Sequence, residues 1–447
     1  MDYVGVMPVL LVAVAGALSW GVRGSYGHEK GASFPGALIA LCICVVSGRP
    51  DWQQAGLFLA LVSGAGIALG GCMSYGKVTG YARSTSWPNA AYGLACLFVI
   101  GGLWGGVGGC LLGLALAGWS PWALLWVAGG IAIAQQVSYH LVVKVARVRM
   151  TPPRSDDWAR CLGALVLLGT ICLVRREQAG LVGLSWGVVG WGTGFTVGMF
   201  FQSLGRRTGI QTNWWRVMEM TLGFFGGGAL AMGLLPLAGS LPELPALGWG
   251  WWLAGAYAVL WLIPMFHVQH NFEHYRQTGA LSRGWWAGRS PLGLTRQSGL
   301  VLAALLGLGL AAWHWWGPQS PLAAAQAAAL ALGGMCVLLG TLLDVGAGKG
   351  VGREVNAKWF VAPYLLVAAG VLLVPRTVPV TMLPVPGVAA VWWGLPLGLV
   401  LAGVLAAISS RFYPQDPPGC HRRFGPGADP EQWYYVPPKQ EATSPGS

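Results

Sequence analysis

The sequence predicts an all-α, polytopic membrane protein, and three observations support this prediction. Of the 447 residues, 55% are hydrophobic and only 9% are charged, whereas soluble globular domains carry roughly 25% charged residues. The chain also contains 70 Gly and 25 Trp. Both are typical of membrane proteins, glycine within the helices and tryptophan at the interfaces. The same composition excludes a disordered chain, because disorder requires few apolar residues.

The membrane-spanning segments are predicted from apolar length, because a helix that crosses a bilayer needs about 20 mostly apolar residues. The candidates number about 13 and lie at 4–22, 33–48, 55–75, 89–117, 122–143, 161–174, 178–202, 213–236, 247–266, 297–315, 323–343, 359–375 and 388–409. The second and sixth are short, and a re-entrant half-helix is the alternative for either one. We therefore expect a single transmembrane domain over 1–409 with 12–13 spans.

The basic residues predict the orientation of this domain. With the N-terminus outside, 23 of the 27 Lys and Arg residues fall on the inner side, and the four outer ones are Arg49, Arg175, Arg176 and Arg376. Cytoplasmic loops of membrane proteins carry such an excess of basic residues. The pattern indicates an N-out, C-in topology in a cytoplasmic membrane, of the kind that forms the bacterial inner membrane.

The net charge of +12 is explained by these inner loops lying beside anionic lipid head groups. Basic and aromatic residues are not interleaved as in nucleic-acid-binding proteins, so the expected partners are the lipid bilayer and a small-molecule substrate. Residues 410–447 contain eight prolines and lack apolar periodicity, which predicts a mostly disordered cytoplasmic tail. Eight of the nine cysteines lie in apolar runs, where a buried free thiol is expected.

Two short echoes suggest internal repetition. The pentapeptide at 18–22 recurs unchanged at 184–188, and the segment 74–80 resembles 203–209. The first pair lies six predicted helices apart and the second only four, so one duplication does not produce both. Parallel halves of about 1–175 and 178–375, an architecture known in transporters, remain an alternative to coincidence in a glycine-rich chain.

The first inner segment, from Arg23 to Gly31, combines four ionisable residues with three glycines. Glycines permit backbone conformations that cradle anions, so Arg23 is a candidate substrate-binding residue. His28 and Glu29 are candidates for proton transfer. The alternative is a short polar turn whose charges only anchor the two flanking helices.

Three further inner loops place basic residues between glycines. Lys77 and Arg206 each lie in a Gly-(Lys/Arg)-x-Thr-Gly pattern, and Asp344 and Lys349 lie in a run of alternating glycines. These residues are candidates for binding a phosphate or carboxylate, although the order required of a phosphate-binding Walker loop is absent. Ordinary turns, and a local ion pair of Asp344 with a nearby base, are the alternatives.

His267, His270 and His274 lie within about 60° of one another on one predicted helix face. Two of these imidazoles could hold one metal ion, but all three would strain, because the first and last are about 10 Å apart along the axis. A proton-coupling role and a hydrated helix end are the alternatives. No cofactor is predicted from the sequence.

Glu219 lies about two turns into the predicted span 213–236. A carboxylate at such a depth is costly unless it faces protein or water, which makes it a candidate proton carrier or substrate contact. A local pair with Arg216, one turn earlier, is the alternative. By the predicted topology, one inward-facing cavity gathers these groups: Arg23, His28, Glu29, Lys77, Arg206, Glu219, His270 and Asp344.

The sequence favours a secondary transporter for a small anionic or polar organic solute, coupled to protons. A membrane-embedded transferase acting on a lipid-linked or phosphorylated substrate at the cytoplasmic face is one alternative. A structural subunit of a membrane complex is another. No catalytic signature or transporter motif in the sequence decides among the three.

Overall fold

The structure is a computed structural model, and it describes residues 2–26, 28–150, 155–210, 212–245, 320–346, 353–376 and 381–428. The described residues are mostly helical, which confirms the predicted helical class. The long helices are α1 (Val6–Tyr26), α2 (His28–Val46), α4 (Gly56–Gly70), α6 (Trp87–Leu116), α7 (Pro121–Tyr139), α8 (Trp158–Arg175), α9 (Gln178–Arg207), α10 (Trp214–Leu234), α14 (Pro321–Gly346), α15 (Arg353–Leu373) and α17 (Gly394–Ser409).

Short elements precede or connect these helices. They are β1 (Asp2–Gly5), α3 (Pro50–Gln54), α5 (Gly76–Ala82), a π-helix at His140–Val145, β2 (Met382–Val385), α16 (Val388–Val391), and 3₁₀ turns at Ser155–Asp157, Leu235–Gly239 and Val374–Arg376. Eleven of the predicted spans coincide with a long helix, and the other two, 247–266 and 297–315, lie outside the described residues.

Five helical segments in the described part of the chain are long and apolar enough to cross a membrane. They are Val6–Arg23, Trp87–Leu116, Trp158–Arg175, Trp214–Gly239 and Val388–Ser409. Their presence is compatible with an integral, multi-pass membrane protein. The third of them includes the short predicted segment 161–174, which continues as a regular helix of 18 residues.

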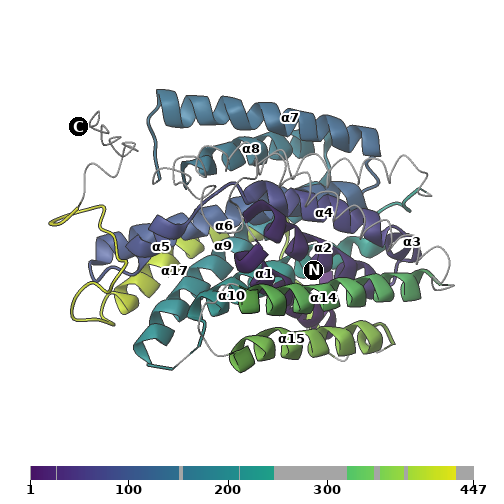
Figure 1. Ribbon diagram of the computed structural model, residues 1–447. Coiled ribbons are helices and arrows are strands. Elements are labelled where there is room, and N and C mark those ends of the chain that lie inside the picture. The colour runs from purple at the N-terminus through teal and green to yellow at the C-terminus, as the bar shows by residue number, and fades with distance from the viewer. Residues whose placement is uncertain are drawn as a thin grey trace, which may run out of the picture.

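The helices lie side by side in stacked layers (Figure 1). The α7–α8 hairpin forms one edge and packs on the bundle through α8, which contacts α6 and α9. The centre contains α1, α2, α4, α6, α9 and α10, and the opposite edge is formed by α14 and α15. The candidate functional residues described below lie in this central group.

The connections between the helices gather at two ends of the bundle. At one end β1 pairs antiparallel with β2, Asp2 lying opposite Val385, and Arg49 donates to the carbonyl oxygens of Ala238 (2.6 Å) and Leu241 (2.8 Å). At the other end the segment after α17 contacts the loop between α5 and α6 and the end of α9. Connections that follow alternate helices therefore lie at the same end.

Glycines bring the central helices into backbone contact, most clearly between α6 and α9. A Cβ atom added to Gly105 would lie 2.3 Å from the carbonyl oxygen of Gly187, and one added to Gly109 would lie 2.2 Å from that of Gly183. The contact is reciprocal, because a Cβ on Gly187 would lie 2.1 Å from the oxygen of Gly105. Small residues four positions apart permit this close helix packing, which is common in membrane proteins.

Cysteine thiols also lie in the interior. The eight cysteines in apolar runs are buried, as the sequence predicts, and none of them is in a disulfide. Two pairs are in contact, Cys72 with Cys161 at 3.6 Å and Cys110 with Cys172 at 3.5 Å between sulfur atoms. Both pairs include a cysteine of α8, so they contribute to the packing of that helix against α6 and the segment that follows α4.

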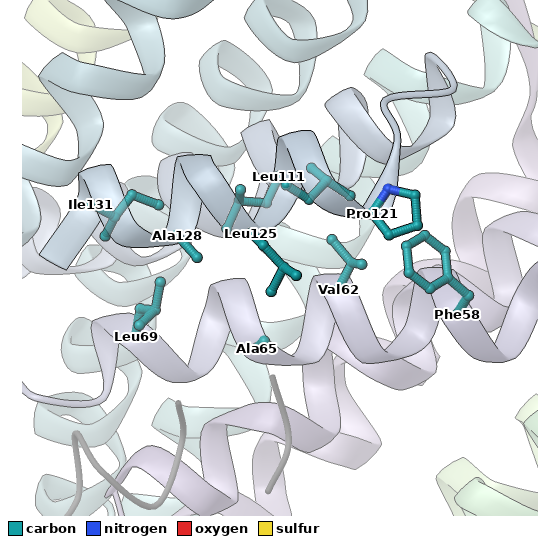
Figure 2. Close-up of a pocket in the computed structure, with 10 residues that line it drawn as sticks. Phe58, Val62, Ala65, Leu69, Leu111, Pro121, Leu125, Ala128 and Ile131 are labelled. Carbon is teal, nitrogen blue, oxygen red and sulfur yellow. The ribbon is translucent and has the colours of Figure 1, made fainter. Parts of the chain in front are cut away.

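An apolar pocket lies between α4 and α7 (Figure 2). Its lining side chains are all apolar and are Phe58, Val62, Ala65, Leu69, Leu111, Pro121, Leu124, Leu125, Ala128 and Ile131. None of the residues predicted to bind substrate or carry protons lines it. The pocket therefore suits hydrocarbon and offers no polar group to a charged solute.

Residues 410–428, the first part of the predicted tail, lie against the bundle. Asp416 accepts hydrogen bonds from the Thr85 backbone (2.7 Å), the Thr85 hydroxyl (2.8 Å) and Arg422 (2.6 Å). The Arg423 backbone donates to Asn89 (2.6 Å), and its guanidinium donates to the carbonyl oxygen of Met150 (2.5 Å). These polar contacts join the segment to α6, to the loop before it and to the segment that follows α7.

Asp416→Asn is expected to loosen this docked tail. Burial alone would raise the pKa of Asp416, but hydrogen bonds from Arg422 and Thr85 outweigh it and lower the pKa to about 2. Docking is therefore complete above about pH 4, near the ordinary pKa of aspartate, and weakens as the pH falls towards 2. Loss of the charge should cost about 1.5–3 kcal/mol of docking free energy.

The measurement is the rate of trypsin cleavage within residues 410–428, which follows the population of the undocked tail. Asp416→Asn should raise this rate roughly tenfold or more. The control is Glu243→Gln, which removes an exposed carboxylate at the other end of the bundle. A cleavage rate equal to that of the wild type would show that Asp416 does not hold the tail.

Candidate functional site

Arg23 and Glu219 form a buried ion pair between α1 and α10. Arg23 lies in the last turn of α1 with 2% of its surface exposed, and Glu219 lies in the second turn of α10 with 1% exposed. Arg23 Nη1 lies 3.4 Å from Glu219 Oε1. The two residues are 196 positions apart in the sequence, so the fold alone brings them together.

The close approach of α1 and α10 makes this pairing possible. A Cβ on Gly16 would lie 2.2 Å from the carbonyl oxygen of Gly223, and a Cβ on Gly223 would lie 2.2 Å from that of Gly16. The helices therefore touch through their backbones about two turns from Arg23. Without side chains between the helices at this point, the guanidinium reaches the opposite carboxylate directly.

Tyr75 and Trp215 complete the surroundings of the carboxylate. Tyr75 precedes α5, is buried, and donates its hydroxyl to Glu219 Oε1 at 2.7 Å. Trp215 donates its indole N–H to the same oxygen at 2.8 Å. Arg23 in turn donates to the Tyr75 hydroxyl. One carboxylate oxygen thus receives hydrogen bonds from three different residues, which stabilises its negative charge.

Aromatic rings surround the guanidinium of Arg23. Its central carbon lies 4.9 Å from the centroid of Tyr75 and 4.7 Å from that of Trp104. Tyr75 also stacks on Trp215, with the ring centroids 5.7 Å apart and an interplanar angle of 16°. The negative faces of the rings compensate part of the hydration that the buried cation has lost.

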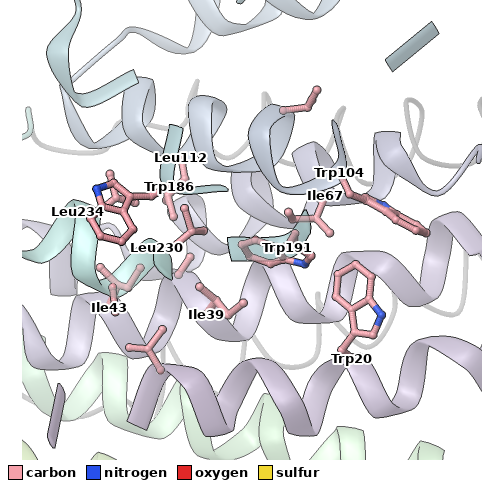
Figure 3. Packing of buried hydrophobic residues seen from close by; sticks show 14 of the residues in the cluster. Trp20, Ile39, Ile43, Ile67, Trp104, Leu112, Trp186, Trp191, Leu230 and Leu234 are labelled. Atoms are coloured by element: carbon pink, nitrogen blue, oxygen red, sulfur yellow. The ribbon is translucent and has the colours of Figure 1, made fainter. Parts of the chain in front are cut away.

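Three indoles next to this pair retain unused hydrogen-bonding capacity. Trp20, Trp104 and Trp191 are fully buried and lie together in the centre of the bundle (Figure 3). Trp20 meets Trp104 edge to face at 5.3 Å and Trp191 at 6.2 Å. Within the described part of the chain, none of their indole N–H groups has a hydrogen-bond partner. Buried donors are normally paired, so this region is unusually rich in donors relative to acceptors.

The structure brings together two of the residues that the sequence predicts for the site, Arg23 and Glu219. Arg216, the alternative local partner of Glu219, has its guanidinium 4.4 Å from the centroid of Phe360 in α15. Lys77 and Arg206 lie at α5 and at the end of α9, in a different cluster. One pair of the expected inner residues, Arg23 and Glu219, is thus in contact in the core. Lys77 and Arg206 are not part of this pair.

The first inner segment is not the glycine-hinged loop that the sequence predicts. α1 extends to Tyr26 and α2 begins at His28, so the chain is helical on both sides of Gly27. Gly31 packs on α1, because a Cβ there would lie 2.6 Å from the carbonyl oxygen of Arg23. This glycine permits close packing of the two helices, whereas the sequence predicts that it belongs to an anion-binding loop.

Several predicted site residues are not among those whose side chains the structure describes. The side chains of His28, Glu29 and Asp344 are not described, although their backbones belong to α2 and α14. Lys349 and the three histidines His267, His270 and His274 lie outside the described residues altogether. In the part that is described, no group of three metal-ligating side chains is present.

The sequence does not predict five residues of the site, which are Tyr75, Trp215, Trp20, Trp104 and Trp191. Aromatic residues near the ends of membrane helices are typical of the interfacial belt. The sequence alone therefore does not distinguish these five residues from ordinary belt residues. One signal was available, because Trp20 belongs to the repeated pentapeptide and Tyr75 to the second echo. Neither echo indicated that the aromatic residue contacts the ion pair.

No protein-family model, curated protein or solved structure matches the chain. The function must therefore be inferred from the geometry of the site. That geometry consists of a buried cation and anion from two helices, with aromatic donors around them and apolar packing beyond.

Proposed function

We propose that the protein is a multi-pass membrane protein of about 13 spans with its N-terminus outside and its C-terminus inside. The arrangement of the connections supports this topology. The segments assigned to the outside by the charge distribution meet through the β1–β2 pair and the Arg49 contacts. Those assigned to the inside meet at the docked tail. In this topology the inner side of the protein carries four basic residues, Arg23, Lys77, Arg83 and Arg206.

We further propose that the protein is a proton-coupled secondary transporter for a small anionic organic solute. The observation that carries this proposal is the buried Arg23–Glu219 pair. Ionisable residues within the membrane are costly and commonly mark ion or substrate pathways. A buried ion pair is also weak evidence for a purely stabilising role, because apolar residues of similar volume are often as favourable.

Proton binding to Glu219 is the proposed trigger. In the described conformation Glu219 neutralises Arg23 and accepts hydrogen bonds from Tyr75 and Trp215. A protonated Glu219 carries no charge, so its attraction for Arg23 falls and the guanidinium can bind the carboxylate or phosphate of a solute. The solute anion and the deprotonated Glu219 thus compete for one cation, which links solute binding to proton binding.

The position of the pair connects this chemistry to movement. Arg23 ends α1, Glu219 lies near the start of α10, and Tyr75 joins α4 to α5. Breaking the pair removes the polar contact among these three parts of the bundle, while the unused indole donors of Trp20, Trp104 and Trp191 are close by. Relative movement of α1 and α10 is the proposed means by which the site opens to the two sides of the membrane.

The test is proton uptake into vesicles that contain the purified protein, in response to gradients of mono- and dicarboxylates and phosphate esters. Wild-type protein should acidify the lumen with at least one of these solutes. Arg23→Ala should reduce the rate by roughly 100-fold, as expected for loss of about 3 kcal/mol of binding to a buried charge. Glu219→Gln should retain solute exchange and lose proton movement.

The control is Arg160→Ala, which removes a mostly buried ion pair with Asp157 at the start of α8. This variant should transport at the wild-type rate. Equal rates in the wild type and Arg23→Ala would contradict the proposal. So would chemical conversion of a lipid-linked or phosphorylated compound without solute flux, which would favour the transferase alternative.

A further inference from the structure

A second cluster of charge lies where the ends of α5 and α9 meet the docked tail. Arg83, which follows α5, donates to the side-chain oxygen of Gln202 at 2.6 Å through Nη2 and 3.2 Å through Nε. Gln202 lies on α9, one turn before Arg206. Since residues four apart share a helix face, Arg83 and Arg206 lie at the same junction.

The tail adds a histidine to this junction. The backbone N–H of His421 donates to the carbonyl oxygen of Gly80 at 3.2 Å, and its ring lies against Tyr81 with the centroids 6.2 Å apart. A Cβ on Gly80 would lie 2.3 Å from Cδ2 of His421, so only glycine permits this contact. Lys77 precedes Gly80 by three residues on the same short helix.

These basic groups act on one another. Burial and the charge of Arg206 lower the pKa of Arg83 to about 10. Burial, together with the charges of Lys77 and Arg83, lowers the pKa of His421. Arg83 therefore lies close enough to Arg206 and to His421 for their positive charges to repel, and His421 is also close to Lys77. Such a cluster favours a partner of opposite charge.

The junction lacks such a partner in the described part of the chain. Within that part, Lys77, Arg83 and Arg206 form no ion pair with a carboxylate. Asp416, the acid of the docked tail, is bound by Arg422 and Thr85. The three cations therefore have no carboxylate to neutralise them among the described residues.

We propose that Lys77, Arg83 and Arg206 bind a phosphoryl group at the inner face, and that His421 closes the site from the tail. A phosphate dianion suits several cations better than a monocarboxylate does, because it offers two charges and several acceptor oxygens. Arginine can bind two of these oxygens at once, and lysine supplies a point charge. The site is separate from Arg23 and Glu219 and does not depend on the proposed transport.

The same chemistry is offered by a phospholipid head group and by a free phosphate ester, and the experiment separates them. The purified full-length protein is placed in bilayer nanodiscs of phosphatidylcholine, with or without phosphatidic acid. Binding of glycerol phosphate is measured by calorimetry in both. Tight binding that phosphatidic acid abolishes assigns the site to a lipid, and binding that persists in its presence assigns it to the free ester.

Arg83→Gln and Arg206→Gln should each weaken phosphate binding about tenfold, the equivalent of about 1.4 kcal/mol. The matched control is Arg207→Gln, because Arg207 is the next residue and lies 5.6 Å from the ring of Phe412. This control should bind as the wild type does. Since an anion favours protonated His421, the wild type should take up more protons per bound phosphate at pH 6.5 than His421→Ala does.

Two results together would overturn the inference. Glycerol phosphate would not bind below about 1 mM in nanodiscs of phosphatidylcholine alone, and the protein would retain no phosphatidic acid. Equal affinities of Arg83→Gln, Arg206→Gln and the wild type would also overturn it, provided that all three show the same thermal stability. Loss of transport in variants of Arg23 with unchanged phosphate binding would contradict neither proposal. The two proposals can therefore fail separately.

Discussion

Arg23→Met is expected to destabilise the protein by about 3–5 kcal/mol, and the double variant Arg23→Met/Glu219→Leu is expected to recover most of this loss. The single variant leaves Glu219, which is 1% exposed, as a buried charge without its cation. The double variant replaces both charges by apolar side chains of similar length. If the pair serves function and not folding, the double variant should be stable and unable to transport.

The measurement is a double-mutant cycle of unfolding free energy in detergent, with Glu219→Leu as the other single variant. The expected interaction energy is at least about 2 kcal/mol, because each single change leaves one buried group without its partner. Transport is measured on the same preparations. Wild-type transport by the stable double variant would contradict a functional role of the pair. Additive losses of stability would show that Arg23 and Glu219 are not coupled.

Gly105→Ala is expected to cost about 2–3 kcal/mol, although alanine usually stabilises a helix. The added Cβ would lie 2.3 Å from the carbonyl oxygen of Gly187, so α6 and α9 would have to separate. Overpacking of this kind typically costs 1–3 kcal/mol. Gly183→Ala should behave similarly, because its Cβ would lie 2.0 Å from the oxygen of Gly109.

Gly129→Ala is the matched control for this prediction. Gly129 lies within α7, and a Cβ there would have no neighbour within 4 Å. The same substitution should therefore be neutral, or stabilising by up to about 1 kcal/mol. Thermal unfolding in one detergent compares the three variants. Equal midpoints for Gly105→Ala and Gly129→Ala would show that the two helices are not held at backbone contact.

Apolar length was sufficient to predict the helices but not their neighbours. The eleven described spans coincide with long helices because each needs only a run of apolar residues. The contact of α6 with α9 depends on glycines at 101, 105, 109 and 113, four residues apart. This spacing is visible in the sequence and predicts a close helix interface, but it does not identify which helix lies opposite.

The candidate site was predictable in part, for a similar reason. Arg23 and Glu219 stand out because charges are rare in apolar segments, and the predicted topology places both near the inner face. Tyr75 and Trp215 do not stand out, since only tertiary packing brings their donors to the carboxylate. The glycines after Arg23 suggested a loop, whereas Gly31 is required where α2 touches α1.

We propose that one proton accompanies each solute anion through competition for Arg23. The empty site contains Arg23 and ionised Glu219, and the occupied site contains Arg23, the anion and protonated Glu219, so both are neutral for a monovalent solute. The most direct measurement is the rate of proton-coupled solute uptake into vesicles at a fixed pH gradient, with the membrane potential set by potassium and valinomycin. We expect one proton per monovalent anion and a rate that does not change with the potential. Uptake that is driven by the potential and is indifferent to the pH gradient would contradict it.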